Sequence, residues 1–139
     1  EPDNSARYSY SSVPAGVRAF DMARRFFAAL AAARADATDP AIGPRLPTMF
    51  SAHGIEPLDA RLFPVSLVQI GIPPDDIWAE RRSRVEHALT QVPGNELRAF
   101  GREYLNLIAA YAAEARQAGP AFVEIQNTML FATVGQKAD

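Results

Sequence analysis

The clearest strand pattern in the chain lies near its C-terminal end. The stretch Phe122–Val134 is rich in β-branched and aromatic residues, lacks proline and glycine, and lies between Gly119-Pro120 and Gly135. Its first half alternates apolar and polar residues, whereas Met129–Ala132 is apolar at every position. The pattern predicts a strand in the middle of a sheet, with helices on both sides and its second half buried on both faces.

A second strand is predicted at Leu58–Gly71. Leu58, Ala60 and Leu62 alternate with polar residues, and the run then becomes apolar on both faces. Pro64 cannot donate a hydrogen bond to a neighbouring strand, so this strand is expected at the edge of the sheet or with a bulge.

Four stretches have the three- and four-residue periodicity of helices. The first spans Val13–Ala35. The second begins at Asp39-Pro40, becomes regular near Arg45 and ends at about His53. The third is opened by Pro73-Pro74-Asp75-Asp76, and the fourth is capped by Asn95 and stopped by Gly119-Pro120.

The third helix has a thin apolar stripe, to which Arg81 contributes through the stem of its side chain between Ile77 and Val85. Its charged residues are Glu80, Arg81, Arg82, Arg84 and Glu86. Because the two signs balance, the basic cluster is interpreted as a solvated face.

The expected order is helix, helix, strand, helix, helix, strand, preceded by a polar lead-in loop over residues 1–12. Two strands do not make a stable sheet. The chain is therefore expected to dimerise, to share its sheet with residues outside this sequence, or to contain a third strand. The fold class is α/β, or α+β in isolation, with residues 1–139 as a single domain.

Composition excludes several classes of protein. The net charge of −2 offers no basic field for nucleic acid, and the absence of cysteine removes disulfides and thiolate chemistry. The longest apolar stretch, Phe26–Ala33, is too short to span a membrane, and no secretory signal precedes it. A cytoplasmic protein is expected, and a first residue other than methionine suggests either trimming of the chain or a piece cut from something longer.

No catalytic signature is present. The chain contains no glycine-rich phosphate loop, no nucleophile elbow and no His-x-x-x-His pair for a metal. Tyr8 and Tyr10 belong either to a plain surface segment or to a loop that lines a cleft. Trp78 is either a core anchor or a wall of a substrate pocket. No residue is assigned a catalytic role.

The order of elements and two short phrases resemble the C-terminal half of class I S-adenosylmethionine-dependent methyltransferases. Glu1-Pro2-Asp3 is similar to the short sequence that follows the fifth strand of that fold. Ala52-His53-Gly54-Ile55 is similar to the end of the helix that precedes the sixth strand. The resemblance implies a Rossmann-like fold in which Leu58–Gly71 is the sixth strand. Phe122–Val134 is then the seventh, an antiparallel strand inserted between the fifth and the sixth. This chain would contribute four helices and two long antiparallel strands.

The same resemblance implies a function. The family's glycine-rich loop and the acidic residue that bind S-adenosylmethionine have no counterpart here and would lie before Glu1. The cofactor is thus expected in the parent protein, and none bound by this chain alone, which should be inactive. The helical insertion Ile72–Pro120 would lie on the substrate side. The candidate contacts to a small-molecule substrate are Asp3, Asn4, Tyr8, Tyr10 and Trp78.

Two other functions stay open. A free-standing α+β interaction or oligomerisation module agrees with the lack of any titratable cluster. A small-ligand domain that uses Trp78 and the tyrosines needs a closed pocket. Unpaired strand edges predict association in either case, so a homodimer through sheet edges or helices is expected.

Overall fold

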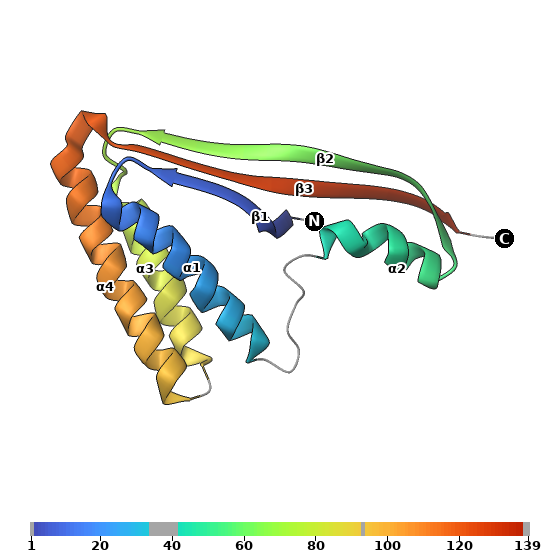
Figure 1. The fold of residues 1–139 in the computed structure, drawn as a ribbon, viewed down its shortest axis with the longest axis horizontal. Coiled ribbons are helices and arrows are strands. Elements are labelled where there is room, and N and C mark those ends of the chain that lie inside the picture. Colours follow the sequence, from blue (N-terminus) through green and yellow to red (C-terminus); the bar gives the residue numbers. More distant parts are fainter. Residues whose placement is uncertain (1, 34–41, 93, 138–139) are drawn as a thin grey trace. The chain divides into compact units, whose positions relative to one another are not determined.

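A computed structural model of the chain describes residues 2–33, 42–92 and 94–137, with the backbone alone for residues 2–6 (Figure 1). The fold is mixed α/β, as predicted. Its elements are β1 (Pro2–Ser11), α1 (Pro14–Ala32), the 3-10 turn η1 (Gly43–Arg45), α2 (Leu46–Ala52), β2 (Ile55–Ile70), α3 (Asp75–Thr90), α4 (Asn95–Ala118), the 3-10 turn η2 (Gly119–Ala121) and β3 (Val123–Lys137).

Most helix ends follow the predicted signals. The predicted cap of the fourth helix at Asn95 is wrong, because Gly94 occupies the N-cap position, Asn95 is the first helical residue, and no described side chain caps this end. α1 begins at Pro14, whose fixed φ suits a first turn, and α4 ends at Gly119 in a left-handed conformation with φ 59°. Gly54, with φ 69°, separates α2 from β2. The expected start of the second helix at Asp39-Pro40 lies outside the described residues. No helix in the described part of the chain has the length and apolarity that a membrane span requires.

The three strands form one sheet in the order β1-β3-β2. Figure 1 shows β1 and β2 running in one direction and β3 running between them in the other, so the sheet is antiparallel. The central position of the last strand and the edge position of the strand that contains Pro64 are both confirmed.

The lead-in loop predicted for residues 1–12 is wrong, because most of this segment is β1. Its end alternates Tyr8, Ser9, Tyr10 and Ser11, a period of two that places the serines on one face and the tyrosines on the other. At the end of the pair, the Ser12 N–H donates to the Val123 carbonyl at 2.9 Å. β1 is thus the third strand that the sequence analysis left as one of three possibilities.

The chain divides into two compact units, and all three strands run through both. The first unit comprises described residues 2–8, 42–67 and 126–137, and contains η1 and α2. The second comprises described residues 9–33, 68–92 and 94–125, and contains α1, α3 and α4.

The second unit contains the hydrophobic core. α4 packs against both α1 and α3, and Phe122, the residue just before β3, is fully buried in the same core. The buried apolar residues are Val13, Ala15, Ala19, Phe26, Leu30, Trp78, Val85, Ala88, Val92, Ile108, Tyr111, Ala112, Ala115 and Phe122. Several alanines among them let the helix axes approach closely.

The first unit is packed more thinly. Phe131 of β3 lies against Gly43, and Phe50 of α2 lies against Gly135, where an added Cβ would come within 2.6 Å of its ring. Every buried apolar side chain that the structure describes belongs to the second unit.

The predicted burial of the second half of β3 on both faces is wrong. Leu130 and Val134 are exposed, whereas the buried end of the strand is its beginning, at Phe122 and Glu124. On β2, the neighbours Leu62 and Phe63 point to opposite faces and both are exposed. The prediction of helices covering both faces therefore fails along this part of β2.

Candidate functional site

The second unit buries one cluster of polar side chains, formed by Arg81, Tyr111 and Glu124 and called here the Glu124 cluster. Glu124 is only 4% exposed. The guanidinium of Arg81 donates to both carboxylate oxygens, from Nη1 to Oε2 at 2.8 Å and from Nη2 to Oε1 at 2.6 Å. The Tyr111 hydroxyl donates to Oε2 at 2.5 Å. The carboxylate thus has three donors, two of them in the bidentate geometry that arginine favours.

Aromatic rings surround this pair of charges. The Arg81 guanidinium carbon lies 4.8 Å from the centroid of the Trp78 ring and 5.7 Å from that of Tyr111. Trp78 and Tyr111 meet edge to face, with their centroids 5.0 Å apart. The rings give the cation favourable electrostatic contacts, and the Arg81 side chain remains 25% exposed.

Three elements bring the cluster together. On α3, Arg81 follows Ile77 and precedes Val85 at intervals of four residues, so it lies on the inward stripe. On α4, Tyr111 lies one turn from the buried Ala115. Glu124 lies two residues after Phe122 and therefore shares its inward face. The cluster fixes the start of β3 to both helices.

The electrostatics favour one cation, one anion and a neutral phenol. Burial disfavours the charge on Arg81, but the hydrogen bonds and negative charge of Glu124 outweigh it and raise the pKa of the guanidinium. Burial also raises the pKa of the Tyr111 hydroxyl, and its hydrogen bond to Glu124 adds to that effect. Tyr111 therefore keeps its proton and continues to donate it.

The start of α1 packs tightly on the cluster. Gly16 lies so close that an added Cβ would be 2.1 Å from Ser11 Oγ and 2.5 Å from Tyr111 Cε2. α1 has no side-chain cap of its own at Val13 and no acidic residue in its first turn. Instead, Glu114 of α4 accepts the Ala15 N–H at 2.7 Å, which satisfies a free donor of the first turn.

These contacts make the Glu124 cluster an anchor and leave it no open reacting group. Its carboxylate is engaged by Arg81 and Tyr111, and the phenol is held in its protonated form. Within the described residues, no group of three or more His, Cys, Asp or Glu side chains is placed to hold a metal ion.

The raised pKa of Tyr111 predicts that the free energy of unfolding decreases at alkaline pH. Because the folded state raises this pKa above the ordinary value of about 10, the contribution to stability is complete below that pH and is lost as the pH rises toward the raised pKa. Urea unfolding should show that the free energy of unfolding falls more between about pH 9 and about pH 11 in the wild type than in the Tyr111→Phe variant. An equal fall in the two proteins would contradict the raised pKa.

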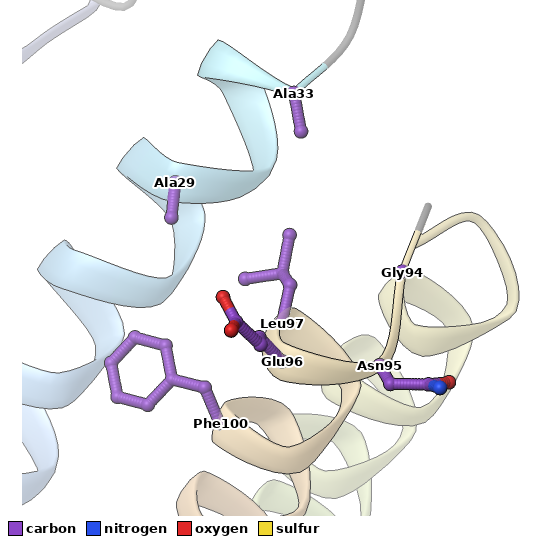
Figure 2. A pocket seen from close by; sticks show the side chains of 7 residues that line it. All are labelled: Ala29, Ala33, Gly94, Asn95, Glu96, Leu97 and Phe100. Carbon is purple, nitrogen blue, oxygen red and sulfur yellow. The ribbon is translucent and has the colours of Figure 1, made fainter.

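A shallow depression lies between the last turn of α1 and the first turn of α4. Figure 2 shows Phe100, Leu97 and Glu96 of α4 on one side and Ala29 and Ala33 on the other. Gly94 and Asn95 complete its lining. The lining combines apolar groups with a single carboxylate and offers no nucleophile with an adjacent base.

The predicted substrate contacts lie on two elements, β1 and α3. Asp3 and Asn4 lie on β1, where only the backbone is described. Tyr8 is 60% exposed and Tyr10 44%, on the face of β1 opposite to the one that carries the buried Ser11. Trp78 is buried beside Tyr111 and serves as a core anchor. Its indole Nε1 has no hydrogen-bond partner among the described atoms.

Sequence reasoning missed the pairing of Arg81 with Glu124. The prediction that Arg81 belongs to a solvated basic face is wrong, because its partner Glu124 lies in the core. Arg82 and Arg84 do lie on that face, where they pair with Glu86 and Glu80. The available signal was an arginine within the apolar stripe of a helix and a glutamate on the inward face of a strand. Opposite charges at two predicted core positions indicate an ion pair, because burying either alone is costly.

Comparison of the chain with protein-family models, with curated proteins and with solved structures returns no match.

Proposed function

We propose that this chain is the C-terminal, substrate-side part of a class I S-adenosylmethionine-dependent methyltransferase. The observation that carries the proposal is the strand order β1-β3-β2, with the last strand antiparallel between two strands that share a direction. The family has the same arrangement of its fifth, seventh and sixth strands. In this correspondence β2 is the sixth strand and β3 the seventh.

The passage from α2 to β2 gives further support. The phrase Ala52-His53-Gly54-Ile55 resembles the family's turn before the sixth strand. α2 ends at Ala52, Gly54 has the positive φ of a helix stop, and β2 begins at Ile55. The short phrase and the local backbone thus agree.

One departure concerns β1. By the resemblance, Glu1-Pro2-Asp3 follows the fifth strand, yet β1 begins at Pro2 and itself pairs with β3. In this correspondence β1 takes the place of the fifth strand. The chain therefore resembles the family in the order and direction of its strands. At the N-terminal end, Pro2 and Asp3 lie at the start of the strand instead of after it.

The proposed role is structural support of methyl transfer. In this family a methyl group passes in line from the sulfonium of the cofactor to a nucleophile of the substrate, and the protein mainly positions the two and excludes water. The cofactor would be bound by residues upstream of Glu1. The substrate would be a small molecule that contacts this half, with Asp3, Asn4, Tyr8 and Tyr10 as the candidate residues. Trp78, the fifth residue expected from the sequence, is buried in the core of the second unit and is left out of the proposed contacts.

Calorimetry with S-adenosylhomocysteine tests this proposal. The 139-residue chain should release no heat of binding, whereas the same protein extended by its upstream coding region should bind at micromolar concentration. Micromolar binding by the 139-residue chain would contradict an upstream cofactor site. Absence of binding by the extended protein would contradict the methyltransferase class.

A free-standing interaction module is the second candidate. It is favoured by the Glu124 cluster, whose buried groups are engaged with one another, and by the exposed apolar side chains of β2. The extended protein separates the two candidates, because a module without catalysis would not bind S-adenosylhomocysteine in either form.

A further inference from the structure

β2 is an edge strand with unusually exposed apolar side chains. It is 16 residues long, and among the described residues its one neighbour in the sheet is β3. The exposed large apolar residues of its part in the first unit are Leu58, Leu62, Phe63, Val65 and Leu67. A long edge of this kind offers free N–H and C=O groups and apolar area to a further strand.

The charges on this edge are few and balanced. Between Pro57 and Leu67 the charged residues are Asp59 and Arg61, whose side chains pair with a distance of 2.6 Å from Nε to Oδ2. No lysine protects β2, and Pro57 and Pro64 are its two residues that cannot donate a backbone hydrogen bond to a neighbouring strand. The edge therefore neither repels an apolar strand nor attracts a strongly charged partner.

The pattern around Ala60 is complementary to itself. In an antiparallel pair of two β2 strands with a two-fold axis at Ala60, Asp59 of each strand lies opposite Arg61 of the other. In the same register Leu58 lies opposite Leu62, and these side chains are 56% and 53% exposed in the single chain. Opposite charges and matched apolar residues across strands each stabilise a sheet by about 0.2–1 kcal/mol.

Neighbouring registers lack this match. An axis at Asp59 or at Arg61 places like charges directly opposite each other, which destabilises strand pairing. An axis at Leu62 places Asp59 opposite Val65 and Arg61 opposite Phe63, so both charges face apolar side chains. Among these four registers, the one centred on Ala60 is the register in which both Asp59 and Arg61 lie opposite a residue of opposite charge. Glu56, the remaining charged residue of β2, lies opposite Pro64 in this register.

We propose that two copies of this chain associate through β2, in an antiparallel two-fold pair centred on Ala60, so that two three-stranded sheets join into one. The other edge strand, β1, is shorter and carries mainly polar residues, which suits it less to this role. The proposal concerns an interaction surface and stands independently of methyl transfer.

A cysteine on the symmetry axis tests the register. The chain has no cysteine, so Ala60→Cys introduces a single thiol. Directly opposite Cα atoms in an antiparallel pair lie about 4.5–5.5 Å apart, within the range of a disulfide. We expect a covalent dimer on a non-reducing gel after mild oxidation. The control Leu62→Cys should give none, because the two thiols would be offset by four residues, or about 13 Å.

Charge reversal tests the surface without cross-linking. Light scattering after gel filtration should give the wild type about twice the chain mass of 15.1 kDa. In the Arg61→Asp variant, residues 59 and 61 of both copies are all carboxylates, and their repulsion should abolish the dimer. The double variant Asp59→Arg with Arg61→Asp again places opposite charges across from each other and should restore the dimer. A monomeric wild type, a dimeric Arg61→Asp variant or an Ala60→Cys variant that does not cross-link would each overturn the proposal. None of these measurements involves the cofactor, so failure here is distinct from failure of the proposed function.

Discussion

Replacement of Arg81 by methionine is expected to lower the free energy of unfolding by about 3–5 kcal/mol. The substitution keeps most of the apolar stem but removes both charge-assisted hydrogen bonds to Glu124. The carboxylate, buried against the core, would keep only the Tyr111 hydroxyl among the donors described above. An uncompensated buried charge is more costly than the absence of the whole pair. Urea unfolding monitored by circular dichroism measures the loss.

Arg82→Met is the matched control, because Arg82 is exposed on the same helix and pairs with Glu86 at the surface. We expect its effect to stay within about 0.5 kcal/mol. The double variant with Arg81→Met and Glu124→Leu should be more stable than Arg81→Met alone, since no buried charge remains. Equal losses for Arg81→Met and Arg82→Met would show that the Glu124 cluster is not an anchor.

Phe26→Ala is expected to cost about 3–5 kcal/mol by opening a cavity in the core of the second unit. Phe26 is fully buried on α1, and its ring contacts Phe100 and Tyr104 of α4 at centroid distances of 6.0 Å. Gly101 of α4 packs directly against the Phe26 ring, because a Cβ added at Gly101 would come within 2.9 Å of that ring. A rigid and close-packed site of this kind cannot collapse around the missing ring.

The adjacent Phe27→Ala provides the control for helix propensity and loss of an aromatic ring. Phe27 belongs to the same helix but is partly exposed. Its replacement should cost clearly less than that of Phe26 in the same urea titration. A cost for Phe27→Ala equal to or above that for Phe26→Ala would contradict the placement of the core between α1 and α4.

The helices and the two long strands could be predicted from the sequence because their signals are local. Periodicity of three and four residues marks α1 and α4. α1 begins at Pro14, and α4 is bounded by Gly94 and Gly119. The edge position of β2 followed from Pro64, whose missing N–H restricts where a strand can lie. Each of these inferences depends on residues within the element itself.

β1 was missed because its stability as a strand comes from its neighbour. The stretch that ends in Tyr8-Ser9-Tyr10-Ser11 is polar enough to predict a loop, and pairing with β3 overrides that preference. The burial of β3 was misjudged for a related reason. The apolar residues Met129–Ala132 predict a covered strand, but coverage depends on which elements pack there, and in the first unit few do.

The Glu124 cluster was visible only in part. The inward positions of Arg81 and Tyr111 follow from helical spacing, but their convergence on Glu124 depends on how α3 and α4 pack against the start of β3. Sequence spacing gives no distance between residues 43 positions apart, as Arg81 and Glu124 are. Tertiary packing thus supplied the partner that the pattern could not.

The sequence of the coding region upstream of the Glu1 codon tests the methyltransferase proposal most directly. We expect an open frame of about a hundred residues or more that contains a strand followed by a glycine-rich loop, since such a loop is needed to hold the cofactor. A start codon immediately before Glu1 would leave no residues for a cofactor site. That result would contradict the proposal and would favour the free-standing interaction module.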